Sequence, residues 1–131
     1  MDVLASKVAS LLKEKNIGFY PSGDHVRIPL PSGFGEIEVG ELCDGDTIFG
    51  LVDHAWHTHG ELLTSYYCGD IASAAVNFLE LIFSGQLKMI EFQLVGEEPR
   101  RIIQDDLESF FKYKQPGEKF TIFDHSGPLP K

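Results

Sequence analysis

The sequence predicts an α+β fold, with a mostly antiparallel sheet of about five to six strands packed on one face by two or three helices. Residues 3–15 and 70–84 repeat apolar side chains at the spacing of a helix, whereas residues 26–39 alternate apolar and polar side chains around a turn. Helices that cover one face of an antiparallel sheet define the α+β class. The length of 131 residues and the apolar content of 43% suit a single domain with its own core.

The first helix is expected over residues 3–15. Its apolar face is formed by four aliphatic side chains, Leu4, Val8, Leu11 and Leu12, and the stretch 16–18 supplies its end. A β-hairpin should follow, because apolar residues alternate with polar ones over 26–30 and 36–39, on either side of a turn rich in Pro, Ser and Gly. A third, more buried strand is expected over residues 47–56.

The helix at residues 70–84 carries signals at both ends. Asp70 is suited to cap its N-terminus, and Gly85 is suited to end it. Strands are expected over 87–96, 100–103 and 120–123, and a short helix should begin at Asp105 or Asp106. Residues 1–124 should form a single α+β domain, and residues 125–131 a flexible C-terminal tail.

The formal charge of −9 comes from one segment of the chain. Residues 24–91 carry eleven carboxylates and only two basic residues, Arg27 and Lys88, whereas acids and bases are equal in number elsewhere. A surface of one sign attracts cationic partners and repels polyanions. We therefore expect a basic protein or a cation as partner. Nucleic acid and anionic membranes are not expected, because both are bound through Lys and Arg. The alternative is that an acidic surface only keeps the protein soluble, without a dedicated partner, although evenly spread acids would serve solubility equally well.

The compartment expected from the sequence is the cytoplasm. No apolar run reaches the roughly 18 residues needed to span a bilayer. The first residues have neither the basic lead nor the continuous apolar block of a secretory signal. The two cysteines, Cys43 and Cys68, form no CxxC pair, so both thiols are expected to be free in a reducing environment.

The densest group of reactive side chains lies at residues 53–61, Asp-His-Ala-Trp-His-Thr-His-Gly-Glu. A strand continuing to residue 59 would place Asp53, His57 and His59 on one face. Two histidines at i and i+2 can share a metal ion, and zinc would need at least one further ligand. Two alternatives stay open. The histidines could make ordinary hydrogen bonds at a wet strand end, or they could join Trp56 in a protein-recognition patch.

The His-Thr-His run at 57–59, followed by an aspartate at the head of a helix, resembles the signature of the JAMM (Mov34/MPN) metalloproteases. The resemblance implies that zinc would be held by His57, His59 and Asp70. It also implies that an upstream glutamate would activate the attacking water, and three are available: Glu36, Glu38 and Glu41. A zinc-dependent peptidase or amidase is therefore the alternative function.

The match to that signature covers residues 57–70 only, and it departs from the family pattern twice. Gly60 stands where a proline usually follows the second histidine, and Tyr67 stands where the family has a serine that helps to hold the oxyanion. The missing serine bears on catalysis more than on metal binding.

Residues 53–87 run from a Trp-His-Thr-His strand end into a helix that closes with Leu-Ile-Phe-Ser-Gly, followed by an edge strand. With its size and acidity, the chain resembles the small single-domain immunity proteins that bacteria pair with toxins of contact-dependent inhibition and other polymorphic systems. The resemblance implies a cytoplasmic binder that occludes the active site of a cognate, basic, nuclease-like toxin and needs no cofactor.

Charge complementarity then predicts the contact surface, since clustered acids speed the encounter with a basic partner. The expected contact residues are acids with aromatic and histidine anchors: Glu36, Glu38, Asp44, Asp46, Asp53 and Glu61, with Trp56, His57 and His59.

Overall fold

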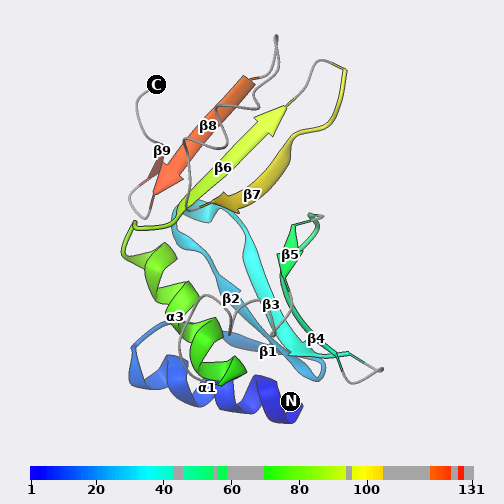
Figure 1. The fold of residues 1–131 in the computed structure, drawn as a ribbon, viewed down its shortest axis with the longest axis vertical. Coiled ribbons are helices and arrows are strands. Elements are labelled where there is room, and N and C mark those ends of the chain that lie inside the picture. The colour runs from blue at the N-terminus through cyan, green and yellow to red at the C-terminus, as the bar shows by residue number, and fades with distance from the viewer. Residues whose placement is uncertain are drawn as a thin grey trace.

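The computed structural model describes residues 1–42, 46–54, 56–58, 70–93, 96–104, 119–124 and 127–128. These residues confirm the α+β class, because helices lie beside antiparallel sheets (Figure 1). The described strands form two sheets rather than one, a five-stranded sheet in the order β1-β2-β3-β4-β5 and a smaller one in the order β7-β6-β8-β9. The expected count of five to six strands is therefore slightly high for the larger sheet.

The first helix, α1, spans Val3–Glu14 and confirms the predicted amphipathic segment. Its N-cap is Asp2, whose carboxylate accepts a hydrogen bond from the Ala5 backbone N–H at 2.7 Å. Such a cap satisfies one of the N–H groups that a helix leaves without a partner. The chain leaves the helix at Asn16, which has a positive φ of 58°, a conformation that asparagine tolerates.

The larger sheet is built from neighbours in sequence. Its strands are β1 (Tyr20–Ser22), β2 (His25–Pro29), β3 (Glu36–Glu41), β4 (Thr47–Leu51) and β5 (His57–Thr58), each antiparallel to the next. The predicted hairpin of β2 and β3 is confirmed. One face of the sheet carries its buried side chains: Val26, Ile28, Ile37, Val39, Phe49 and Leu51.

The third strand begins at residue 47 and buries its last three residues, as expected, but its predicted end at residue 56 is wrong. β4 ends at Leu51, where a turn closes with a hydrogen bond from the His54 backbone N–H to the Leu51 carbonyl at 3.2 Å. Asp53 takes a positive φ of 65° in that turn, which aspartate accepts more readily than most residues. Because the chain reverses there, Asp53 and His57 do not alternate along one strand.

The second described helix, α3, spans Ile71–Phe83 and begins and ends as predicted. The Asp70 carboxylate accepts from the Ser73 backbone N–H at 2.8 Å, and Gly85 has a φ of 83° just past the helix. The two helices pack side by side on the apolar face of the larger sheet (Figure 1). Among the described residues, no helix is long and apolar enough to cross a membrane.

The smaller sheet lies at the far end of the molecule from the N-terminus (Figure 1). Its strands are β6 (Lys88–Gln93), β7 (Arg100–Gln104), β8 (Lys119–Asp124) and β9 (Gly127–Pro128). The strands predicted at 100–103 and 120–123 are confirmed. β9 pairs with β8 inside the segment expected to be a tail. The short helix predicted after Asp105 or Asp106 lies outside the described residues.

Phe34 connects the two sheets. It follows the 3-10 turn η1 (Pro31–Gly33) that joins β2 to β3, and its side chain is 1% exposed. Its ring lies 5.3 Å from the ring of Phe123 in β8. The Arg101 guanidinium of β7 lies 5.0 Å from the Phe34 ring centroid and donates to the Phe34 carbonyl. Arg101 is also paired with Glu91 of β6 at 3.2 Å. One loop of the larger sheet is thus held by β7 and β8 of the smaller one, and β6 fixes the arginine that holds it.

Replacing Phe34 with Ala should destabilise the whole domain by about 3–5 kcal/mol, the usual cost of removing a buried phenylalanine. Urea unfolding followed by circular dichroism measures this difference. Phe34→Leu is the matched control, because it keeps most of the apolar volume and loses only the ring contacts. A cost below about 1 kcal/mol for the Ala variant would show that the sheets are held together elsewhere.

Candidate partner-binding face

The polar side of the larger sheet faces away from the two helices, because side chains alternate along each strand. The strand register places Tyr20, Arg27, Glu38, Gly50 and His57 in one row across all five strands. We call this side the outer face and define it by six residues: Tyr20, His25, Arg27, Glu36, Glu38 and His57.

Arg27 lies at the centre of the outer face and holds two glutamates. Its Nε donates to Glu38 Oε1 at 2.8 Å, and its terminal nitrogen lies 4.0 Å from Glu36 Oε1. The Tyr20 hydroxyl lies 2.6 Å from the Glu36 carboxylate oxygens, to which it donates. This hydrogen bond raises the pKa of Tyr20. Glu36 and Glu38, both predicted contact residues, are therefore brought together and fixed in position.

His25 extends the same network toward the N-terminus of α1. Its Nδ1 lies 3.0 Å from Glu38 Oε2, and its Nε2 lies 3.0 Å from the Glu41 carbonyl and 3.8 Å from Asp2 Oδ2. Both ring nitrogens face oxygen acceptors, and only the doubly protonated ring can donate to both. The hydrogen bond to Glu38 accordingly raises the pKa of His25, against the opposing effect of burial.

The pKa of Glu38 is shifted in the opposite direction from that of His25. Its partial burial raises its pKa, but the hydrogen bonds from His25 and Arg27 outweigh this effect, so the pKa of the carboxyl is lowered. The carboxylate therefore stays ionised in the network over a wide pH range.

Gly40 makes room for the His25 ring. A Cβ built on Gly40 would overlap the imidazole of His25, which lies across the β3 backbone at this point. Close approach of a side chain to the backbone is one reason for a glycine inside a strand. In the sequence, a glycine inside a predicted strand indicates that another group comes close to the backbone there. In the structure this group is the His25 ring.

Asp2 joins the outer face to α1. While one carboxylate oxygen caps the helix at Ala5, the other accepts from the Glu41 backbone N–H at 2.8 Å. The same carboxylate lies near the His25 ring. A single side chain thus ties the start of α1 to the end of β3.

The other predicted contact residues are dispersed. Asp46 is exposed beside β4, Asp53 is exposed in the β4–β5 turn, and His57 is exposed on the outer face. Trp56 stacks on Phe78 at 5.9 Å and lies edge-on to Phe49, so it belongs partly to the core. The remaining three lie outside the described residues: Asp44, His59 and Glu61.

Part of the acidic charge is neutralised by residues from outside the segment 24–91. Lys15 of α1 lies 3.3 Å from Glu80, and Arg101 of β7 pairs with Glu91. Lys88, one of the two basic residues within the segment, donates instead to the Gly85 carbonyl at 2.6 Å. The charge balance along the sequence therefore overstates how far the negative charge is concentrated around residues 24–91, although the net charge of the chain is unchanged.

The structure assigns Asp70 a capping role, and the resemblance to the metalloprotease signature gains no support from its position. Hydrogen bonding from the Ser73 backbone N–H lowers the pKa of Asp70. No group of three His, Cys, Asp or Glu side chains suited to a metal ion occurs among the described residues, which include His57 but not His59. Zinc binding by His57, His59 and Asp70 stays a prediction.

Alternation in the sequence places Glu36 and Glu38 on the wet face of the sheet, where the structure has them. It does not predict the groups that hold them, Tyr20, His25 and Arg27, or the approach of Asp2 to His25. Strand alternation indicated that His25 and Arg27 face the same side as the glutamates. The pairing of Asp2 with Glu41 joins residues 39 positions apart, and no local pattern predicts such a contact.

Comparison of the chain with protein-family models, with curated proteins and with solved structures found no match in any of the three.

Stability should fall as the pH rises through the folded-state pKa of His25. That pKa is raised, so the protonated ring contributes stability below the unfolded-state value, and this contribution is lost on deprotonation. The effect should be at most about 1 kcal/mol, because solvent screens the partly exposed pair. Urea unfolding from about pH 5 to about pH 9 measures it, with His25→Gln as the variant that should show a flatter profile.

A second variant tests the position of the ring without removing it. Gly40→Ala should displace His25 from its acceptors and bring its pKa, read by NMR titration, closer to the ordinary value. An unchanged titration in this variant would contradict the role assigned to Gly40.

Asp70→Ala should lower the melting temperature by roughly 3–6 °C through the lost helix cap, whereas Asp70→Asn should leave it nearly unchanged. Thermal unfolding by calorimetry distinguishes the two variants. Elemental analysis of the same samples tests the metal alternative. One zinc per chain that is lost in Asp70→Asn would support ligation by Asp70 instead.

Proposed function

We propose that this chain is an immunity-type binding protein that neutralises a cognate basic toxin, of the nuclease type, by occluding its active site. The proposal places the protein in the cytoplasm and requires no cofactor and no turnover. The observation that carries it is the pair of carboxylates, Glu36 and Glu38, held side by side on the outer face by Tyr20, Arg27 and His25.

The network makes these carboxylates suitable acceptors for a cationic partner. Each oxygen of Glu38 already receives one hydrogen bond, one from Arg27 and one from His25, and a carboxylate oxygen can accept a second. Lys and Arg side chains that bind phosphate form charge-assisted bonds of the same kind with carboxylates. Because the glutamates are already fixed, binding costs little further side-chain entropy.

The support of the face is rigid. β2 and β3 are joined along their length, and their inner side chains, Val26, Ile28, Ile37 and Val39, are at most 1% exposed. A face held in this way can cover the mouth of a cleft without rearranging. The net charge of −9 would draw a basic partner toward the molecule before contact.

The proposal predicts that the outer face controls association with the toxin. Glu36→Gln with Glu38→Gln should lower the on-rate for a basic toxin domain about tenfold at low salt, and less at high salt, because charged groups steer the encounter. Stopped-flow kinetics at about 20 mM and about 300 mM salt measure this. Each amide side chain keeps one acceptor oxygen, and both residues lie on the polar side of the sheet, outside the apolar core, so the fold should be preserved.

Glu14→Gln is the matched control, since Glu14 is exposed on α1, in the helical layer behind the sheet. It should leave the on-rate unchanged. Co-expression with a panel of basic nuclease toxins provides the cellular readout. The proposal is contradicted if no toxin-expressing strain survives when this chain is co-expressed. It is also contradicted if the double variant and the wild type have equal on-rates.

A further inference from the structure

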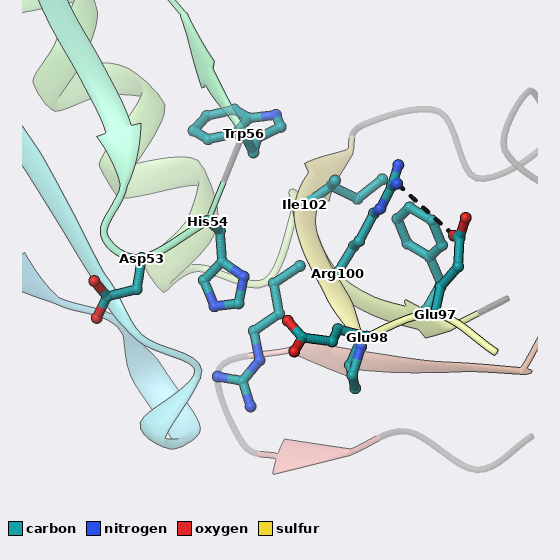
Figure 2. A pocket seen from close by; sticks show the side chains of 10 residues that line it. Asp53, His54, Trp56, Glu97, Glu98, Arg100 and Ile102 are labelled. Carbon is teal, nitrogen blue, oxygen red and sulfur yellow. Dashed lines mark ion pairs between the residues drawn. The ribbon is translucent and has the colours of Figure 1, made fainter.

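A cleft with a volume of about 740 Å³ lies between the two sheets (Figure 2). The turn from β4 to β5 forms one wall, and the β6–β7 hairpin forms the other. Its described lining comes from both sheets and mixes aromatic, aliphatic and charged side chains: Asp53, His54 and Trp56 from the first wall, and Phe92, Glu97, Glu98, Pro99, Arg100, Arg101 and Ile102 from the second.

β7 presents its edge to this cleft. Three consecutive residues of the strand, Arg100, Arg101 and Ile102, all line it. Because consecutive side chains point to opposite faces of a strand, a cleft that all three line reaches the edge of β7. It also extends over one face of the sheet, where it is lined by Phe92, the cross-strand partner of Arg100. β7 is also the terminal strand of the smaller sheet among the described strands, where it pairs with β6. The edge of a sheet offers backbone N–H and C=O groups to an added strand.

The opposite wall holds a fixed aromatic side chain. Trp56 is partly exposed, and its ring stacks on Phe78 at an interplanar angle of 18°. A ring held in this way contributes contact area to a ligand at little entropic cost. In Figure 2 the His54 ring projects from the β4–β5 turn into the space that the Glu98 carboxylate faces, whereas the Asp53 carboxylate points away from this space.

The charges of the cleft favour a cationic ligand. Both arginines in its lining are already paired, Arg101 with Glu91 at 3.2 Å and Arg100 with Glu97 at 3.7 Å. Glu98 forms no ion pair with any other residue that the structure describes. Its carboxylate extends from the β6–β7 turn toward His54 (Figure 2). An entering Lys or Arg side chain would therefore meet a carboxylate that makes no ion pair within the described part of the chain.

We propose that this cleft receives an extended segment of the partner protein, which adds to β7 as a further strand and directs a Lys or Arg side chain at Glu98. This inference rests on the proposed function and names the mode by which the basic partner is recognised. The cleft adjoins the outer face, since the Val52 backbone N–H donates to the Glu36 carbonyl at 2.9 Å and Asp53 follows directly. One partner can contact both surfaces.

The sole tryptophan of the chain, Trp56, makes fluorescence a direct reporter on the cleft. The probes are acetylated and amidated pentapeptides: Thr-Val-Arg-Val-Thr, its citrulline counterpart, which lacks the charge, and Thr-Val-Glu-Val-Thr. We expect the arginine peptide to change Trp56 emission with a millimolar Kd and the other two to bind at least about tenfold more weakly. Amide shifts in a ¹⁵N spectrum should move along β7.

Glu98→Gln should reduce the preference for arginine over citrulline to about onefold, and Glu14→Gln should preserve it. Three results would overturn the inference: no emission change up to about 10 mM peptide, equal binding of the three peptides, or amide shifts confined to the outer face. Failure here is distinguishable from failure of the proposed function. If the protein neutralises a toxin but binds no peptide, only the inference about the cleft is contradicted. If it binds the peptide but neutralises no toxin, the proposed function is contradicted.

Discussion

The packing of Phe34 between Arg101 and Phe123 is the contact on which the arrangement of the two sheets depends. The loop that carries Phe34 belongs to the larger sheet, but the ring and the carbonyl of Phe34 are both contacted by the smaller one. A guanidinium that faces a ring and also pairs with a carboxylate has little freedom to rearrange. Arg101 also lines the cleft between the two sheets. The contact between Phe34 and Arg101 therefore helps to set the shape of that cleft.

The elements that follow from local chemistry were predictable. The hairpin of β2 and β3 follows from alternation, and α3 follows from its apolar stripe with a capping aspartate and a terminating glycine. The chain reversal after Leu51 was not predictable, because Val52 and the residues around it also suit a strand, and only the positive φ of Asp53 produces the turn. Whether consecutive strands join one sheet or two depends on long-range packing, which strand periodicity does not encode.

In the candidate site, too, some features follow from local sequence and others depend on long-range contacts. Alternation is enough to place Glu36 and Glu38 on a wet face, but it says nothing about their partners. The Glu36 and Glu38 carboxylates, which have few basic neighbours in the sequence, are held in the structure by Tyr20, Arg27 and His25. Glu80 and Glu91 pair with basic residues from other parts of the chain. The result is fewer free charges than the sequence suggests, but charges with defined positions, which suits recognition better than solubility alone.

The double role of Asp2 links events on the outer face to the order of a helix on the other side of the sheet. Its carboxylate caps α1 and also borders the imidazole of His25, which in turn holds Glu38. A ligand that draws Glu38 away from His25 would alter the surroundings of the cap without touching α1. Binding of such a ligand to the outer face would then change the amide hydrogen exchange of the first turn of α1, on the opposite side of the sheet.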